Sequence, residues 1–378
     1  MDRGRPGSLA RRAPDHGVKR HSVRVHILVT EINAHGGIQR YNRQMMRATR
    51  ELVDEQGGEM VVFSLNDSPQ SPSVRGFGRS HRRFVTSALT TAVFERPDVL
   101  IVGHVNFASL LPAYRLLWPR TRSFVVAYGK EVEGRLKPGV RTGLRMATGV
   151  LPLSESTRHL VLAKHGVPAE RAHLLRYGFD PRRHTPPIAR PPGYPRVLSV
   201  ARLRLEDAYK GIDTTLEALP DLCRQFPGLR YTVVGEGDDL PRLHALAGRL
   251  GISDRVEFAG SVGQQELENL YEECDIFVLP STHEGLGIVY LEAMARGKPV
   301  VGIRAGGVAD AVVHEANGLL VEHKSPESVG GAVSRLANDP DLCRRLGAWG
   351  QRCTVPAFAR ARMQARLSEI LTGETGKK

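Results

Sequence analysis

The chain has 378 residues, 41% of them hydrophobic and 25% charged, which predicts two domains and excludes a mainly disordered chain or a disulfide-stapled miniprotein. No apolar stretch approaches the roughly eighteen residues of a membrane span, which argues against an integral membrane protein. The net charge of +13 lies wholly in the first half, because residues 1–190 hold 31 basic and 15 acidic residues and the remainder hold 22 and 25.

Residues 1–20 are rich in Arg, Gly and Pro and predict a disordered basic tail without an export signal. From residue 23, short β-branched runs alternate with longer amphipathic stretches, the pattern of parallel strands joined by crossover helices. The strands expected in the first half are Val23–Thr30, Met60–Leu65, Asp98–Gly103, Ser123–Tyr128 and Gly149–Leu153, with a shorter candidate at His173–Tyr177. The expected helices include Ile38–Glu51, Ala108–Leu117 and Glu155–Lys164.

Residues 186–195 contain five prolines and predict a stiff linker at the midpoint of the chain. After this linker the alternation restarts, and a last helical stretch, Pro356–Leu371, exceeds what the second domain needs. The expected strands are Arg196–Ala201, Arg230–Gly235, Val256–Ala259, Asp275–Leu279, Pro299–Ile303 and Gly318–Val321. The expected helices are Ile212–Gln225, Leu240–Arg249, Gln264–Glu273, Leu286–Arg296 and Pro326–Ala337.

These elements predict two α/β domains in tandem, each with a parallel sheet buried on both faces. Ligands of open α/β sheets bind beyond the carboxyl ends of the strands, so the cleft between the domains is the expected site. Gly36 and Gly37 follow the first strand and open the first helix. They allow close approach of a phosphate to the helix N-terminus, although ordinary turn chemistry explains them equally well.

Two cations follow the first strand of the second domain. Arg202 ends the strand and Lys210 precedes the next helix, so the pair is placed to hold the two phosphates of a nucleoside diphosphate. The alternative is that both are solvated surface residues, which is the usual position of Arg and Lys.

A loop and an apolar helix at residues 280–297 contain two glutamates. Glu292 lies in the helix and needs a partner if it is buried; Arg296, one turn later, and the hydroxyls of a ribose or sugar are equally good candidates. Glu284, in the preceding loop, is placed to hold a hydroxyl, while Gly285 and Gly287 offer main-chain N–H groups to phosphate.

The spacing Glu284-x7-Glu292, within the segment HEGLGIVYLEAMARGKPVV, resembles the signature of glycosyltransferase family 4, retaining enzymes of the GT-B fold. Arg202 and Lys210 resemble the paired phosphate-binding cations of that family, and Gly36-Gly37 its first glycine loop. The segments 303–307 and 317–321 match its closing strands. The resemblance spans residues 23–371 and is densest in the second half.

The resemblance implies a metal-independent transferase without a cofactor, whose second domain binds a UDP- or GDP-sugar and whose first domain takes a hydroxyl acceptor. Arg202 and Lys210 would neutralise the leaving diphosphate, Glu284 would hold the transferred sugar, and Glu292 the donor ribose. Gly260 and Val262 would border the base. The remaining donor contacts implied are Gly36, Gly37, Gly235, Gly285, Leu286, Gly287 and Ile288. The domains implied are 21–185 and 196–353, joined by the linker 186–195, with residues 354–378 crossing back to the first domain.

Two positions depart from the family pattern. Tyr128-Gly129-Lys130-Glu131 stands where many members have His-Gly, with the His facing the reacting sugar, and a tyrosine hydroxyl is not a base near neutral pH. His104, at the end of its own strand, is the alternative imidazole for the cleft, although a core histidine is the favoured interpretation. Residues 176–180 read Arg-Tyr-Gly-Phe-Asp where Pro-Asn-Gly-Val-Asp is usual.

No metal site is expected. The Asp-x-Asp sequence at Asp339–Asp341 lies between helices, where a helix cap is its expected role. The four cysteines lack Cys-x-x-Cys spacing and predict free thiols of a reduced, cytoplasmic protein. They are Cys223, Cys274, Cys343 and Cys353.

Three other functions compete with sugar transfer. A sugar-nucleotide epimerase of GT-B fold differs only in needing no acceptor. A dinucleotide-dependent oxidoreductase would need a third glycine after Gly235 and Gly237. A nucleic-acid binder fits the charge but lacks any recognised binding motif. The Arg-rich stretches 75–83 and 135–145 are interpreted as solvated faces or as contacts with an anionic membrane, which would place the protein at the inner membrane face with a lipid-linked acceptor. Bacterial polysaccharide or glycolipid synthesis is the expected pathway.

Overall fold

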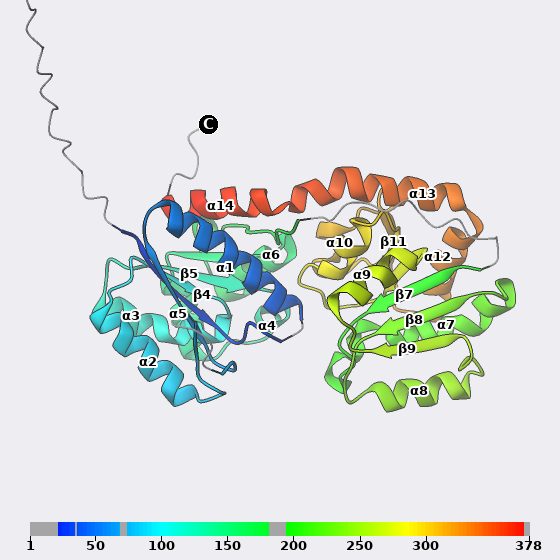
Figure 1. Cartoon of the computed structure of the whole chain (residues 1–378), viewed down its shortest axis with the longest axis horizontal. Coiled ribbons are helices and arrows are strands. Elements are labelled where there is room, and N and C mark those ends of the chain that lie inside the picture. Colours follow the sequence, from blue (N-terminus) through cyan, green and yellow to red (C-terminus); the bar gives the residue numbers. More distant parts are fainter. Residues whose placement is uncertain (1–21, 35, 69–73, 181–193, 374–378) are drawn as a thin grey trace, which may run out of the picture.

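Two lobes lie side by side in the computed structural model, which describes residues 22–34, 36–68, 74–180 and 194–373 (Figure 1). The N-lobe is formed by residues 22–180 and the C-lobe by residues 194–358; the last helix is shared as described below. The predicted basic tail, His35 and residues 186–193 of the predicted linker lie outside the described residues.

The N-lobe is built on a six-stranded sheet whose pairings are all parallel, in the order β3-β2-β1-β4-β5-β6. The central strands read as near-continuous runs of apolar and β-branched residues because helices cover both faces of the sheet. The strands are β1 (Arg24–Val29), β2 (Glu59–Ser64), β3 (Val74–Gly76), β4 (Val99–Val102), β5 (Arg122–Ala127) and β6 (Gly149–Pro152). The helices are α1 (Gly37–Glu55), α2 (His81–Phe94), η1 (Val105–Leu110), α3 (Leu111–Leu117), α4 (Lys130–Glu133), α5 (Pro138–Met146), α6 (Glu155–His165) and η2 (Ala169–Arg171).

The C-lobe repeats the plan with the strand order β12-β11-β10-β7-β8-β9, again parallel throughout. Its strands are β7 (Arg196–Val200), β8 (Arg230–Val234), β9 (Val256–Gly260), β10 (Ile276–Leu279), β11 (Val300–Ile303) and β12 (Gly318–Val321). Its helices are η3 (Leu205–Lys210), α7 (Ile212–Gln225), α8 (Leu240–Arg249), α9 (Gln264–Glu273), α10 (Ile288–Met294), α11 (Val308–Ala311), α12 (Pro326–Asn338), α13 (Pro340–Trp349), η4 (Gly350–Thr354) and η5 (Val355–Phe358).

Both sheets therefore have the strand order of a Rossmann fold, which confirms the predicted pair of parallel-sheet α/β domains. In this order the chain changes direction across the sheet between the first and fourth strands, and ligands bind at that point. The relevant strands are β1 and β4 in the N-lobe and β7 and β10 in the C-lobe.

Four elements differ from the sequence prediction. The segment His173–Tyr177 is not a strand: it runs beside β6 and donates hydrogen bonds from His173 and Leu175 to β6 carbonyl groups, but only one bridge, between Val150 and Ala172, forms. Strand β3 and helix α2 were not named among the predicted elements; both overlap the Arg-rich stretch 75–83 that was interpreted as a solvated face. Helix α13 was also missed.

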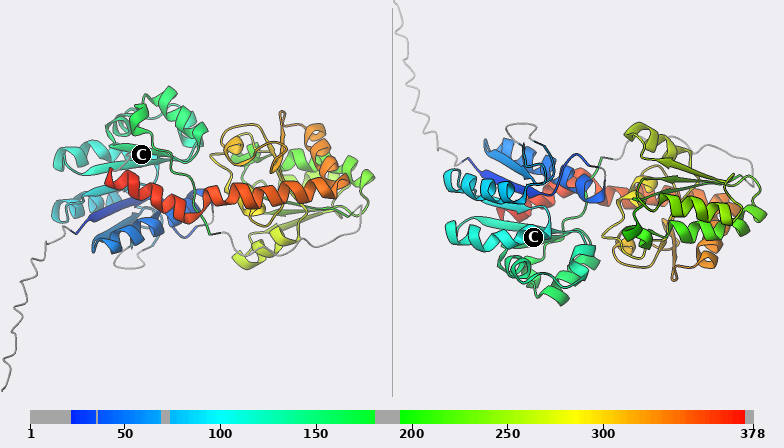
Figure 2. Two further views of the ribbon diagram at one scale, coloured as in Figure 1. Left: turned by 90° about the horizontal axis from the view of Figure 1, so that it is seen from above. Right: turned by 90° about the horizontal axis from the view of Figure 1, so that it is seen from below.

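Helix α14 (Arg360–Thr372) follows the C-lobe but packs against α1 of the N-lobe. Seen from above, it continues the line of α13 across both lobes (Figure 2). Arg360 pairs with Glu51 of α1 and, at 2.8 Å, with Asp180, and the buried Leu367 joins the hydrophobic core. The last helix thus connects the two lobes a second time.

None of the helices in the described part of the chain combines the length and the apolar character that a membrane-spanning helix requires.

Candidate active site

The carboxyl ends of β7 and β10 bring Lys210 and Glu284 together. These strands are neighbours in the C-lobe sheet, so the loops that follow them share one edge. Lys210 Nζ forms an ion pair with Glu284 Oε1, and the two side chains are only 17% and 11% exposed. A cation that can bind a phosphate therefore lies next to a carboxylate that can bind hydroxyl groups.

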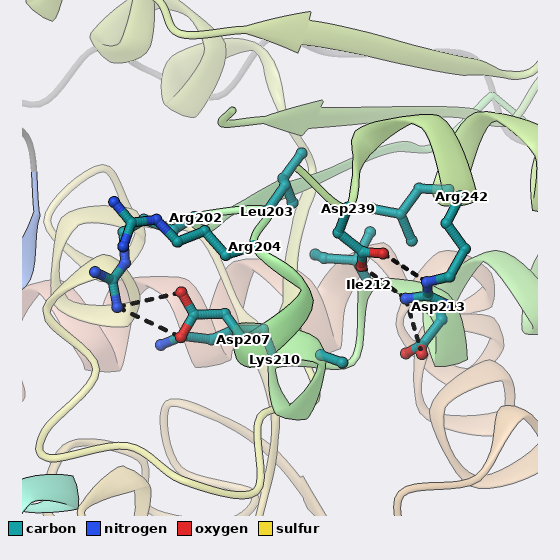
Figure 3. A pocket seen from close by; sticks show the side chains of 11 residues that line it. Arg202, Leu203, Arg204, Asp207, Lys210, Ile212, Asp213, Asp239 and Arg242 are labelled. Carbon is teal, nitrogen blue, oxygen red and sulfur yellow. Dashed lines mark hydrogen bonds and ion pairs between the residues drawn. The ribbon is translucent and has the colours of Figure 1, made fainter. Parts of the chain in front are cut away.

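Arg202 is held beside this pair by Asp207. Its Nη2 atom lies 3.2 Å from Asp207 Oδ2, and the Asp207 side chain is almost completely buried in η3 (Figure 3). The guanidinium group remains half-exposed. Arg202, Asp207 and Lys210 border a shallow surface hollow, whose other wall contains the paired side chains of Asp239 and Arg242.

Glu292 in α10 is bound by partners that lie far away in the sequence. Tyr271 donates a hydrogen bond of 3.0 Å to Oε2, and Arg40 from α1 of the N-lobe forms an ion pair with Oε1. Arg296, one of the two kinds of partner that the spacing left open, instead donates to the Glu292 carbonyl group at 3.1 Å. The i+4 interpretation of the carboxylate was therefore wrong, since the Arg296 guanidinium lies over the Tyr271 ring and 3.9 Å from Glu268.

The charges of this cluster stabilise one another. Burial opposes the charge of Arg40, but the adjacent Glu292 carboxylate holds the pKa of the guanidinium above its ordinary value. Burial, with the Glu292 charge added to it, raises the pKa of Tyr271 well above its usual range. Tyr271 therefore remains a hydrogen-bond donor toward Glu292 at every physiological pH.

Glycines allow the two lobes to touch next to Glu284. A Cβ atom on Gly285 would lie 1.8 Å from the Tyr128 carbonyl oxygen, and one on Gly129 would lie 2.9 Å from Gly285 Cα. From the C-lobe side, Gly307 donates to the Glu284 carbonyl group at 2.7 Å. Only glycine fits where these main chains meet.

The other predicted glycines lie around the same cleft. Gly37 begins α1 and faces the start of α10, where a Cβ atom on Gly37 would lie 3.9 Å from Ile288 Cδ1. Gly235 must be glycine because a Cβ atom would lie 1.8 Å from the Ala201 carbonyl oxygen. Gly260 ends β9, the edge strand of the C-lobe sheet, and Val262 follows it; the Gly260 carbonyl group accepts from Gly235 N at 2.8 Å.

Tyr128 is turned into the N-lobe. Its hydroxyl lies 2.6 Å from Asn42 Oδ1 and 2.9 Å from the Gly103 carbonyl oxygen, and burial raises the pKa of the phenol well above its usual range. The structure thus places the Tyr128 main chain, and not its hydroxyl, against the loop that carries Glu284.

His104 follows β4 and is partly buried. Its Nδ1 atom accepts a hydrogen bond of 3.2 Å from Asn106 N and so caps η1, while burial lowers the pKa of the ring. The neutral ring therefore carries its proton on Nε2, which can donate a hydrogen bond but cannot accept a proton. A histidine whose ring nitrogen is used in a local cap agrees with the favoured interpretation, in which the hydrogen-bonding groups of His104 are satisfied within the N-lobe.

Further residues of the two lobes meet across the cleft although the sequence did not point to them. Asp310 of α11 accepts from Glu155 N at 2.8 Å and so caps α6 of the N-lobe. Lys130 lies 3.8 Å from Asp207 Oδ1 and 4.0 Å from the centre of the Tyr209 ring. In the sequence, only their positions shortly after Gly37 and Gly129 could have indicated that Arg40 and Lys130 lie at the site.

Among the residues that the structure describes, no three His, Cys, Asp or Glu side chains gather as a metal-binding group. Asp339 accepts from Leu342 N at 2.8 Å and caps α13, which confirms the role predicted for the Asp-x-Asp sequence. Cys223, Cys343 and Cys353 are free thiols, as predicted.

The family described as "Glycosyl transferases group 1" matches residues 182–352. A GDP-mannose-dependent alpha-(1-6)-phosphatidylinositol monomannoside mannosyltransferase of Mycobacterium tuberculosis is 33% identical, covering 90% of this chain and 95% of its own. The putative colanic acid biosynthesis glycosyltransferase WcaL of Escherichia coli is 28% identical over 87% of this chain and 84% of its own.

Solved structures resemble the whole arrangement. Sucrose-phosphate synthase from Thermosynechococcus elongatus superposes with a TM-score of 0.79 at 20% identity, covering 93% of this chain and 99% of that one. The Anabaena protein HepE in complex with UDP-glucose gives 0.75 at 20% identity, covering 92% and 99%. At such low identity these likenesses show the fold alone.

Proposed function

The chain belongs to the glycosyl transferases group 1 family and is a glycosyltransferase of GT-B fold; from this premise we propose that it transfers a sugar from a nucleoside-diphosphate sugar to a hydroxyl acceptor. The observation that carries the proposal is the convergence of Arg202, Lys210, Glu284 and Glu292 at the carboxyl ends of β7 and β10. The mycobacterial relative is named as GDP-mannose-dependent, which supports a donor of this class.

Each of these residues has a role that fits its surroundings. Arg202 and Lys210 bind the donor diphosphate and neutralise the charge that develops as it leaves. Lys210 moves from Glu284 to the phosphate when the donor enters, which frees the Glu284 carboxylate for the sugar hydroxyls. Glu292 holds the ribose, and the main-chain groups of Gly37, Gly285 and Gly287, with those beside Leu286 and Ile288, border the phosphates.

The proposed transfer retains the configuration of the sugar. The acceptor oxygen attacks C1 from the face that the diphosphate leaves, the bond from C1 to the phosphate oxygen breaks, and the acceptor proton passes to that phosphate oxygen. Glu284, the carboxylate proposed to lie nearest the sugar, is occupied by the sugar hydroxyls once Lys210 has moved to the phosphate, which supports direct transfer over a covalent intermediate. The cations Arg202 and Lys210 supply the positive charge, so we propose that no metal is required.

We propose a lipid-linked or anionic acceptor for the N-lobe. Helices α2 and α3 lie side by side at the end of the N-lobe remote from the C-lobe, where Phe94 and Leu116 are 86% and 84% exposed (Figure 1). Arginines flank both side chains, at Arg96 and Arg115. Apolar tips among cations suit an anionic membrane surface. Sedimentation of the full chain with phosphatidylglycerol vesicles but not with phosphatidylcholine vesicles at low salt would support this contact, and equal sedimentation would oppose it.

Thermal unfolding with UDP, GDP and ADP tests the donor class. We expect one base to raise the melting temperature, because a ligand bound to the folded state stabilises it. Transfer with the matching nucleotide sugar, in the presence of EDTA, followed by NMR of the product linkage then tests the reaction. An inverted linkage, or activity that EDTA abolishes and Mg²⁺ restores, would contradict the proposal.

A further inference from the structure

Arg40 joins the lobes at the carboxylate proposed to hold the donor ribose. It stands on the first turn of α1, three residues after Gly37, and reaches Glu292 on α10 of the other lobe, 252 residues away in the sequence. The side chains of Arg40 and Glu292 are 19% and 16% exposed, so the pair is shielded from water without being sealed.

The carboxylate of Glu292 is fixed through both oxygens. Oε1 faces Arg40 and Oε2 accepts from Tyr271 at 3.0 Å. Each carboxylate oxygen can accept a second hydrogen bond, so the carboxylate can accept one from a ligand on each oxygen. Two acceptors on one carboxylate match the vicinal hydroxyl groups of a ribose.

A surface ion pair contributes little, but this pair is mostly buried, and its loss would leave a carboxylate without its counter-charge. In addition, Arg40 and Glu292 belong to different lobes. The two groups can therefore meet only when the lobes lie as close as they do here, where Gly129 and Gly285 also approach each other.

We propose that Arg40 is a positioning residue through which the N-lobe fixes Glu292 for the ribose diol, so that the closed enzyme favours ribonucleotide over deoxyribonucleotide donors. This inference rests on the proposed function, in which Glu292 binds the donor ribose. Arg40 acts through Glu292 and needs no contact with the nucleotide.

The test compares nucleotide binding by the full-length wild-type chain, Arg40→Ala and Arg40→Lys in calorimetry. The probes are the diphosphate that stabilises the wild type, UDP or GDP, and its 2′-deoxy and 3′-deoxy forms. Hydrogen bonds to a charged group discriminate strongly, so we expect the wild type to prefer the ribonucleotide by about tenfold or more. The preference should fall below about threefold in Arg40→Ala and be partly kept in Arg40→Lys.

Arg47→Ala is the matched control, because Arg47 is an exposed arginine on the same helix. It removes the same charge and should leave the preference unchanged. Circular dichroism checks that each variant is folded. If Arg40→Ala does not fold, the inference is tested by whether Arg40→Lys has a smaller ribonucleotide preference than the wild type.

Two results would overturn the inference while leaving the proposed function intact. If Arg40→Ala weakens the ribonucleotide and its deoxy forms by the same factor, Arg40 acts on the phosphates or on the fold. If Arg40→Ala binds the nucleotide more tightly, Arg40 occupies the place of the ribose. Failure of every nucleoside diphosphate to bind the wild type would instead overturn the proposed function, and this inference with it.

Discussion

Lys210 and Glu284 neutralise one another while the donor is absent, although each is assigned to a different part of the donor. Such pairing keeps two mostly buried charges compensated until phosphate and hydroxyl groups replace them. The pair also holds both side chains near their working positions. The contribution of each side chain to transfer is measured by substituting it alone.

Glu284→Ala should abolish transfer while the protein remains folded, because the sugar hydroxyls lose their carboxylate and Lys210 loses its partner. We expect the rate of transfer to fall by more than about 100-fold. Nucleotide-sugar turnover and circular dichroism measure the two effects. Glu217→Ala, at an exposed carboxylate of α7, is the control. Turnover near that of the wild type would refute the role of Glu284.

His26 should make the protein less stable in acid. It lies in β1 with no exposed surface, and burial lowers the pKa of its ring to about 4, with Arg75 and Arg24 adding to the effect. The folded state therefore resists a proton that the unfolded chain accepts below about pH 6.5, so stability is lost as the pH falls from about 6.5 to 4. The loss reaches about 3 kcal/mol.

Urea unfolding of the wild type and of His26→Leu at pH 7 and pH 4.5 checks this. The difference in stability between the two proteins should shift in favour of His26→Leu at the lower pH. An unchanged difference would show that His26 is not the group that senses acid.

At the scale of elements, the strand ends decide where the chemistry lies. Both sheets have the same strand order; in the C-lobe the loops after the first and fourth strands carry the proposed site, and in the N-lobe the segments after β1 and β5 contact it. The alternation of apolar runs predicted these strands well, because a strand buried on both faces has a distinctive composition. It failed for His173–Tyr177, since an apolar run beside an edge strand need not complete a ladder.

Gly285→Ala should impair closure of the lobes. The added Cβ atom would lie 1.8 Å from the Tyr128 carbonyl oxygen, and two main chains must then move apart. We expect kcat/KM to fall by about tenfold or more while the melting temperature changes little, because the substitution removes no buried side chain. Gly331→Ala, where nothing lies within 4 Å of the new atom, is the control. Equal kinetics in the two variants would contradict the prediction.

The two lobes are connected twice, once where the chain passes from the N-lobe to the C-lobe and once through α14, which packs on α1. One hydrophobic core cluster includes residues of both lobes and of α14, whereas a second cluster belongs to the N-lobe alone. Helix α14 is therefore a structural part of the N-lobe although it follows the C-lobe in the sequence. This arrangement limits how far the lobes can separate, because α13 and α14 follow one line across them (Figure 2).

Leu367→Ala tests this second connection. Leu367 is fully buried in α14, and its truncation should cost about 2–5 kcal/mol by leaving a cavity. The loss should appear in the unfolding of the N-lobe although the residue lies eleven positions from the end of the chain. Hydrogen exchange of β1 and α1 should quicken, while that of β7 and β8 should not. Faster exchange confined to the C-lobe would contradict the assignment.

The sequence by itself determined the two α/β lobes, the positions of most strands and the segments that carry Glu284, Glu292, Arg202 and Lys210. These follow from local composition and spacing, which act within one strand or one helical turn. The roles of these four residues are contacts with the sugar donor, and they stay predictions for the experiments proposed above.

Only the tertiary structure decided which charges meet. Local spacing offered Arg296 as the partner of Glu292, and the docking of the lobes supplied Arg40 instead. It also turned the Tyr128 hydroxyl into the N-lobe and placed the Tyr128 main chain against Gly285. Contacts between residues hundreds of positions apart depend on how two sheets pack, and no periodicity within one segment contains that information.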